Sequence, residues 1–181
     1  MVSPELVAAC RRGDRAAFEE VVRRTYRHVY TQAFRIVGDR HEAEDVAQEA
    51  YLRVFRSLAG FRGESQFETW LYRIVANAAV THLRRRGRIG ELTLDREDRP
   101  VEPAADVRVA EQAVDREELS RALADLPVSL RAVVVLKDVY GMPHKEIAQL
   151  LGTTEGAVKV RLHRARRRLK ERLFGPEEES R

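Results

Sequence analysis

Apolar residues recur every three or four positions along most of the chain, which is the spacing of an amphipathic helix. No alternating run of apolar and polar residues is long enough to predict a strand. The fold class expected from this pattern is therefore all-α. The predicted helices are a short one that starts with Leu6, Ala9 and Cys10, followed by helices over residues 18–37, 43–57, 67–86, 114–126, 130–140, 143–151 and 155–169.

Helical periodicity is lost between Gly87 and about Gln112, where Pro100, Pro103 and charged residues predominate. This composition is typical of a tether that cannot bury a core. The sequence thus predicts two small helical domains, residues 1–90 and 113–174, joined by a flexible acidic linker at 91–112. A short tail follows at 175–181.

The last two predicted helices meet at a tight turn. Gly152 suits the left-handed position just past a helix end, and Thr154 can cap the next helix. One face of that next helix is apolar, and the opposite face is rich in lysine and arginine. The pattern favours a C-terminal helix-turn-helix whose second helix enters a DNA major groove. A helical hairpin with a solvated basic face is the alternative interpretation.

Aromatic, amide and arginine side chains interleave between Phe61 and Arg86. This mixture suits single-stranded DNA, because aromatic faces stack on bases, amides hydrogen-bond to base edges and arginines bind phosphates. Trp70 either packs in the core, as its helical spacing indicates, or wedges a duplex open. The helix before this segment carries a stripe of acidic and amide side chains. This stripe is either a contact surface for another helix or simply a solvated helix face.

Charge and cysteine content narrow the possible functions. The 33 basic and 29 acidic residues give a net charge of +4, with basic clusters at 82–88 and 159–172 and a mainly acidic stretch at 91–111. Separated blocks of opposite sign suggest two contacts with anions. Cys10 is the only cysteine, so no internal disulfide can form, and we expect it to be a small core residue.

The chain offers no pattern for catalysis or for a membrane. Its five histidines form no metal-ligand pattern, and neither a phosphate-cradling glycine loop nor a nucleophile elbow is present. No apolar run approaches the length of a bilayer span, and no secretory leader is recognisable. We expect a cytoplasmic protein with no membrane insertion, no cofactor, no metal and no enzymatic activity.

From about Phe18 to Leu173 the sequence resembles a bacterial RNA polymerase sigma factor of the extracytoplasmic function group. The resemblance rests on residues 43–49, residues 69–74 with Asn77, the pair Leu126-Pro127 and the final helix-turn-helix. It implies a stress-response type of factor that directs core RNA polymerase to specific promoters and promotes DNA opening for transcription initiation. The alternative is a stand-alone helix-turn-helix repressor or activator, which would typically dimerise on a palindrome.

The resemblance also implies roles for individual positions. Contact with the polymerase β′ clamp helices would involve Asp45, Gln48, Glu49 and Leu52. The −10 element would be captured, one base being flipped out, by Phe61, Arg62, Gly63, Ser65, Arg73, Asn77, Arg84 and Arg85. The −35 element would be held by Lys137, Lys159, Val160, Arg161, His163 and Arg164.

Further partners follow from the same resemblance. They are the polymerase β flap, promoter DNA in duplex and single-stranded form, and an anti-sigma factor. The linker would either thread toward the polymerase active-site cleft or serve as a simple tether. Arg166, Arg167 and Lys170 are expected to touch phosphates or solvent.

Overall fold

The structure is a computed structural model, and it describes residues 2–88 and 116–175. These residues contain helices and turns and no β-strand, in agreement with the all-α class predicted from the sequence. They separate into two compact units with the division between Leu83 and Arg84. The linker, most of the C-terminal tail and the predicted helical position at Val114 lie outside the described residues.

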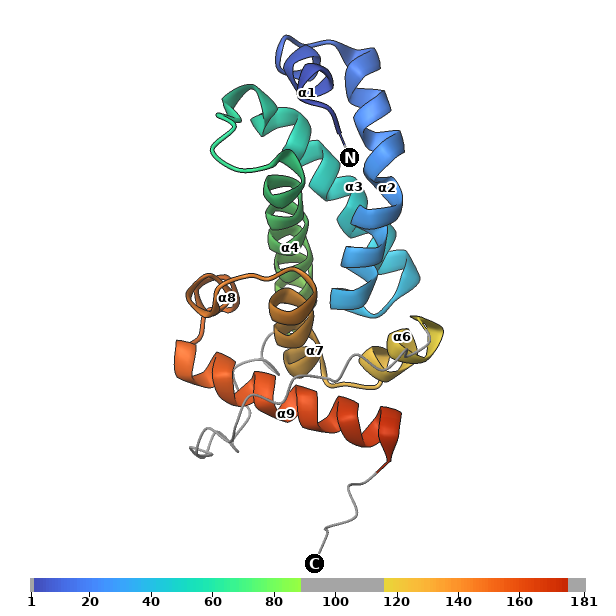
Figure 1. Cartoon of the computed structure of the whole chain (residues 1–181), viewed down its shortest axis with the longest axis vertical. Helices are drawn as coiled ribbons and strands as arrows, with labels where there is room; N and C mark the ends of the chain where they lie inside the picture. The colour runs from blue at the N-terminus through green and yellow to red at the C-terminus, as the bar shows by residue number, and fades with distance from the viewer. Residues whose placement is uncertain (1, 89–115, 176–181) are drawn as a thin grey trace, which may run out of the picture. The chain divides into compact units, whose positions relative to one another are not determined.

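The N-terminal unit is built from α1 (Pro4–Arg11), α2 (Arg15–Val37), α3 (Arg40–Ser57), the 3-10 turn η1 (Leu58–Gly60) and α4 (Phe67–Arg85) (Figure 1). The last two residues of α4 fall beyond the division. Asp14 and Asp39 cap α2 and α3, and Gly38 ends α2 in the left-handed region with φ 81°. A residue without Cβ adopts this conformation at little cost.

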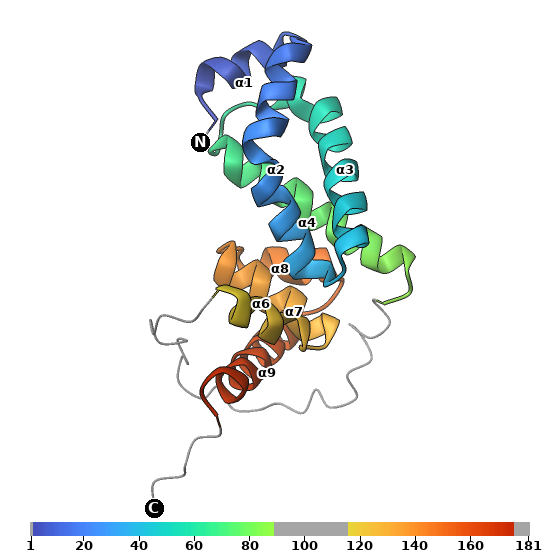
Figure 2. The ribbon, with the colours of Figure 1, turned by 90° about the vertical axis from the view of Figure 1, so that its right-hand side faces the viewer.

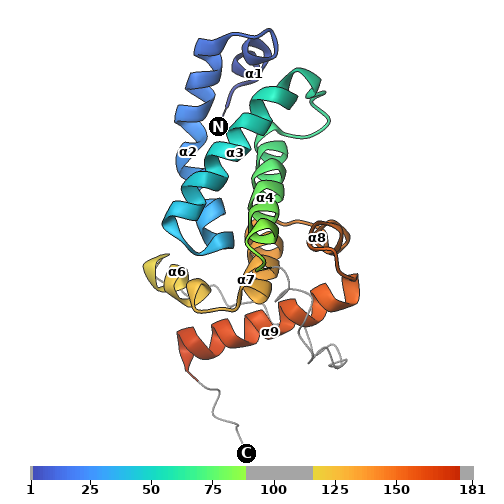
Figure 3. The ribbon, with the colours of Figure 1, turned by 180° about the vertical axis from the view of Figure 1, so that it is seen from behind.

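The helices α2 and α3 lie side by side and form the largest interface in this unit, as Figures 1 and 3 show. Polar bonds join the helices inside the apolar packing. The hydroxyls of Thr25 and Tyr51 are 2.8 Å apart between α2 and α3, and Gln32 Nε2 donates to Tyr72 O in α4 over 2.9 Å. The apolar core comprises Val21, Val29, Ala33, Ile36, Val46, Ala50, Val54, Leu71, Val75 and Leu83.

The apolar residues of α4 differ in burial. Leu71, Val75 and Ala78 are buried, whereas Trp70 and Ile74 are only partly buried. Cys10 is buried in α1, in agreement with its predicted core role. Trp70 and Ile74 lie at the margin of the apolar stripe, where helical spacing alone does not distinguish a core position from a boundary position.

The C-terminal unit contains α6 (Arg116–Ala124), α7 (Val128–Val134), the π-helical turn η2 (Val135–Val139), α8 (His144–Leu151) and α9 (Glu155–Phe174). Figure 2 shows the same helices from the side. The long helix α9 contacts α7, α8 and α6, so it is the element on which this unit assembles. Its buried side includes Val158, Leu162, Ala165 and Leu169.

The helix predicted over 130–140 is interrupted. Tyr140 N bonds to Val135 O at 3.3 Å, a step of five residues that marks a π-turn.

Arg131 is buried in α7, and its Nη1 donates to Ala124 O at 3.1 Å. This bond satisfies a carbonyl at the end of α6 that has no partner within its own helix.

Candidate nucleic-acid interface

The outward face of α3 carries the acidic and amide-bearing stripe. Asp45, Gln48 and Leu52 are exposed, and Leu52 retains 47% of its accessible surface. Glu49 is partly buried and pairs with Arg53, with Glu49 Oε1 and Arg53 Nε 2.8 Å apart. All four predicted clamp-contact residues therefore lie on one helix, with polar groups beside an exposed apolar side chain.

Sequence reasoning missed Phe55 on the same helix. It follows Leu52 by three residues and is 54% exposed, the highest value among the large apolar side chains in the described residues. Its ring meets Phe18 of α2 edge-on, with centroids 5.1 Å apart. The signal was its helical spacing from Leu52, which extends the stripe by one turn.

Three aromatic rings cluster where the loop after η1 enters α4. The centroid of Phe61 lies 5.9 Å from that of Phe67 and 5.0 Å from that of Trp70. Phe61 is half-buried, so its predicted role at a pocket wall is compatible with its position. Trp70 lies against both phenylalanines at the edge of the core, where its side chain is partly buried.

The rest of this loop is open to solvent. Arg62 and Gly63 are exposed, Ser65 is partly buried, and Gly63 has φ 74°. Arg62 Nη1 approaches Glu64 Oε1 only to 4.0 Å, with both side chains at least 80% exposed. Such a pair contributes little to stability, so the Arg62 guanidinium remains available to a phosphate.

Arginine and amide side chains form an exposed stripe along α4. Arg73 and Asn77 are exposed and one turn apart, and Asn77 Nδ2 donates to Arg73 O over 2.8 Å. Arg84 and Arg85 are exposed at the end of the same helix. The predicted −10 residues of α4 thus share one helix, where an amide that now bonds its own backbone could exchange that bond for a base edge.

The predicted helix-turn-helix is present in α8, the turn and α9. Gly152 has φ 66° and ψ 39°, and Thr153 N bonds back to Ala148 O at 2.9 Å. Thr154 caps α9 by accepting a bond from Ala157 N at 3.1 Å. The turn chemistry expected from the sequence therefore sets the start of α9.

The positions predicted to contact the −35 element separate by exposure. Lys159 is exposed, and Val160, His163 and Arg164 are partly buried, so these four reach the surface. Arg161 does not, because its side chain is buried with 1% exposure. The prediction that Arg161 lies on the DNA-facing side is wrong.

Arg166 also differs from expectation. Its guanidinium binds both carboxylate oxygens of Asp138, with Nε–Oδ2 at 2.9 Å and Nη2–Oδ1 at 2.7 Å. The Arg166 side chain is 17% exposed and joins α9 to the π-turn η2. Arg166 is thus a structural cation rather than one that faces solvent.

Positive charges from two elements meet near His144, a residue that sequence reasoning did not select. Burial lowers the pKa of His144, and the charges of Lys137 and Lys159 lower it further, while Glu155 opposes them. Lys137 belongs to η2 and Lys159 to α9, and both act on one imidazole. These two predicted DNA contacts therefore contribute to one positive field, which is suited to a phosphate.

No helix within 2–88 or 116–175 is both long and apolar enough to span a bilayer. Across the same residues, no group of three or more His, Cys, Asp and Glu side chains is placed to hold a metal ion.

Comparisons with known proteins match both units. The family model for Sigma-70 region 2 matches residues 21–89, and that for Sigma-70, region 4 matches residues 116–169. ECF RNA polymerase sigma factor SigE of Mycolicibacterium smegmatis is 40% identical over 89% of this chain, which spans 64% of that protein's length. The RNA polymerase sigma-H factor of Pseudomonas aeruginosa is 35% identical over 90% of this chain and 89% of its own length.

Among solved structures, the sigma factor RpoE from Bartonella quintana, in complex with the anti-sigma factor NepR, has a TM-score of 0.56. It is 25% identical, and the match covers 86% of this chain and 96% of that one. CnrH, in complex with the cytosolic domain of CnrY, shares the fold with a TM-score of 0.53 at 24% identity.

Proposed function

The chain belongs to the extracytoplasmic function group of the sigma-70 family, and from this premise we propose that it directs core RNA polymerase to specific promoters and helps to open the DNA. The single observation that carries the proposal is that regions 2 and 4 follow each other in one chain, over residues 21–89 and 116–169. A stand-alone helix-turn-helix regulator would leave the whole N-terminal unit without a role.

The N-terminal domain, residues 1–90, recognises and opens the −10 element. Exposed arginines and Asn77 on α4 hold and read the displaced strand, and the half-buried ring of Phe61 faces a flipped base. Flipping a base costs a few kcal/mol, which stacking and hydrogen bonds in the loop must recover. The residues proposed for this role are Phe61, Arg62, Gly63, Ser65, Arg73, Asn77, Arg84 and Arg85.

The C-terminal domain, residues 113–174, holds the −35 element and the polymerase β flap. Lysine can pair with guanine O6 and N7, and an apolar side chain can contact a thymine methyl group. Lys159 and Val160 supply these groups at the start of α9, and Lys137 adds charge toward the backbone. With Arg161 withdrawn because of its burial, the proposed set is Lys137, Lys159, Val160, His163 and Arg164.

The stripe on α3 binds the β′ clamp helices. A helix with exposed carboxylates beside Leu52 and Phe55 combines complementary charge with apolar contact, and charge complementarity favours a correctly oriented encounter.

An anti-sigma protein is a further proposed partner, supported by the complex in which the similar RpoE was solved. The chain itself is not an enzyme in this proposal, because the polymerase performs the chemistry. Its place of action is the cytoplasm, where core polymerase and promoters are found.

The proposal is tested by mixing the purified chain with core polymerase and a library of genomic fragments. Run-off transcripts that appear only when both components are present, followed by sequencing of their start sites, support a sigma factor and give its promoters. Tight binding to duplex DNA without polymerase, together with no transcripts, would instead support the stand-alone regulator.

A further inference from the structure

An ion pair between Asp138 and Arg166 joins two elements that each carry a proposed DNA contact. Lys137 precedes Asp138 in the π-turn η2, and Lys159 lies two helical turns before Arg166 in α9. We propose that Asp138 and Arg166 are positioning residues, whose pair fixes η2 on α9 so that the two lysines bind the same stretch of promoter backbone. The inference deepens the proposed function and rests on it.

The pair makes two bonds rather than a single charge contact. Arg166 Nε lies 2.9 Å from Asp138 Oδ2, and Arg166 Nη2 lies 2.7 Å from Asp138 Oδ1. The Arg166 and Asp138 side chains retain 17% and 28% of their accessible surface. A bidentate pair that is partly withdrawn from water fixes orientation as well as distance, which a point charge does not.

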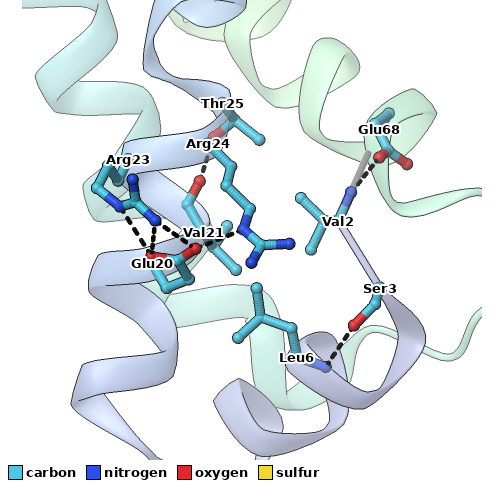
Figure 4. Close-up of polar contacts among 9 residues, drawn as sticks. All are labelled: Val2, Ser3, Leu6, Glu20, Val21, Arg23, Arg24, Thr25 and Glu68. Atoms are coloured by element: carbon cyan, nitrogen blue, oxygen red, sulfur yellow. Dashed lines mark hydrogen bonds and ion pairs between the residues drawn. The ribbon is translucent and has the colours of Figure 1, made fainter.

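The ion pairs of Glu20 in the N-terminal unit are of a different kind (Figure 4). Glu20 binds Arg23 and Arg24, which follow it by three and four residues in α2 and are 74% and 47% exposed. Such pairs contribute little to stability and support only their own helix. Asp138 and Arg166 are 28 positions apart and belong to two elements, so their pair holds one element against the other.

The orientation of Lys137 depends on how η2 is anchored. Gly141 N donates to Lys137 O at 3.0 Å, so this backbone bond shapes the turn itself. Val135 and Leu136 are fully buried and anchor the inner side of η2. Asp138 anchors the outer side, because its carboxylate is bound to α9. Without that second anchor, the outer side that carries Lys137 would be held from one direction only.

The cations of the two elements act on a common point. Burial lowers the pKa of His144 in α8. The charges of Lys137, Lys159 and Arg166 lower it further, so cations from η2 and α9 lie near the same imidazole. An unpaired carboxylate at Asp138 would repel a DNA phosphate, but the Arg166 guanidinium compensates its charge. The positive field toward DNA is thus preserved while the carboxylate serves as an anchor.

Asp138→Asn separates this role from a simple effect of charge, because the two predict opposite signs. Electrostatics alone would make promoter binding tighter when an anion close to the DNA is removed. Loss of the anchor should instead weaken binding roughly 3- to 10-fold and reduce the slope of log affinity against log salt by about one contact.

Arg166→Lys tests the geometry without changing the charge. The lysine keeps a cation at this position but cannot form the two parallel bonds, so binding should again weaken. Matched controls come from the other end of α9, where Arg172 Nε lies 3.3 Å from Asp125 Oδ2 and both side chains are 61% exposed. Asp125→Asn and Arg172→Lys should bind the promoter no more weakly than the wild type does.

A double-mutant cycle with Lys137→Ala gives a readout that a purely structural pair would not change. In the wild-type background, Lys137→Ala should weaken promoter binding several-fold. In the Asp138→Asn background it should have almost no further effect, because Lys137 has already lost its position. A pair that only stabilised the fold would lower the unfolding midpoint and leave the full effect of Lys137→Ala in both backgrounds.

The full chain is assembled with core polymerase for these measurements. Its affinity for a duplex with a −35 element found by transcript sequencing is measured by fluorescence anisotropy at several salt concentrations. The unfolding midpoint of each variant is recorded so that only folded proteins are compared, and Arg166→Lys takes the place of Asp138→Asn in the cycle if the latter does not fold. Unchanged or tighter binding of the folded variant, or additive effects in the cycle, would overturn the inference.

Failure of this inference differs from failure of the proposed function. If the holoenzyme transcribes and the cycle is additive, the chain is still a sigma factor and the pair only stabilises its C-terminal unit. If the wild-type protein gives no transcripts with core polymerase, the proposed function itself fails, and the pair has no promoter contact to position.

Discussion

Arg161 follows Val158 by three residues and precedes Ala165 by four, so helical geometry places it on the inner face of α9. Its side chain is accordingly buried, although arginine is rarely found in a protein interior. The number of basic residues on α9 led sequence reasoning to treat all of them as one exposed face. The position of Arg161 relative to the apolar stripe, rather than its charge, determines that its side chain is buried.

Lys159 and Arg161 should therefore respond differently to substitution. Lys159→Ala should leave the unfolding midpoint unchanged and weaken binding to a promoter's −35 duplex by about 1–3 kcal/mol, because it removes a surface donor. Arg161→Ala should lower the free energy of unfolding by about 2–4 kcal/mol, because it removes a buried side chain together with the contacts that this side chain makes. Thermal unfolding and duplex binding measured on both variants check this. Equal stability of the two variants would contradict it.

Tyr51 provides a pH-dependent test of the N-terminal core. Burial raises its pKa to about 12 from 10, against the opposing effect of its bond with Thr25. The folded protein thus keeps a proton that the unfolded chain loses near pH 10, so the contribution of Tyr51 to the free energy of unfolding is intact below pH 10. This contribution is lost as the pH rises toward 12, at about 1.4 kcal/mol per pH unit.

The measurement is the denaturant midpoint between pH 8 and 12 for the wild type and Tyr51→Phe. Lysine titration affects both proteins alike and cancels in their difference. The gap in stability between the wild type and the variant should shrink or reverse above pH 10. Parallel curves would show that Tyr51 does not hold its proton as described.

At the level of elements, the helix-turn-helix was predictable because its signals are local. Gly152 and Thr154 are within three positions of the helix ends that they terminate and begin. The π-turn η2 was not predictable, since the run of valines around it is apolar at every helical phase. The contact of Val2 with Glu68 spans 66 residues, and no local pattern encodes a contact of that range.

Gly152→Ala tests whether the turn depends on its left-handed residue. With φ at 66°, a side chain at this position should cost about 1–2 kcal/mol of unfolding free energy. Gly156→Ala is the control within the first turn of α9, where the backbone is helical, and it should be neutral or stabilising by up to about 1 kcal/mol. Chemical denaturation should show a loss of stability for Gly152→Ala and none for Gly156→Ala, and a loss at Gly156 equal to that at Gly152 would refute the assignment.

The α3 stripe is tested by reversing one charge. Glu49→Lys should weaken holoenzyme formation about tenfold or more, because it places a cation in an interface proposed to be complementary in charge. Glu19→Lys makes the same change in charge at an exposed position of α2 and should bind core polymerase as the wild type does. Affinity is measured by titrating labelled protein with core polymerase. Unchanged affinity of Glu49→Lys would remove Glu49 from the proposed surface.

At the scale of the whole molecule, the sequence correctly indicated an all-α chain of the sigma factor family. Helical spacing predicted most element boundaries to within a few residues, and ordered family motifs pointed to the function. A pocket between α1 and the loop that leads into α4 was not predicted, because it forms only when residues near 2–11 meet residues 61–68. The division into domains at 90 and 113 remains a prediction.

Each unit carries its own apolar core, so each should fold alone. Fragments 1–88 and 113–181 should both show helical circular dichroism and cooperative unfolding, since the buried side chains that each needs lie within it. The unfolding curve of the intact chain should then equal the sum of the two fragment curves. A fragment without a cooperative transition would mean that its core depends on the rest of the chain.

The inward position of Arg161 has a consequence for how such a factor could acquire new target genes. Only the surface positions of α9 can vary without disturbing the interior, and the inward arginine separates Lys159 and Val160 from His163 and Arg164. Evolution, or a designer who retargets the protein, can therefore change only a few separate positions of α9. The range of promoter sequences that related factors can come to recognise is limited by the substitutions that the interior of this small helical unit tolerates.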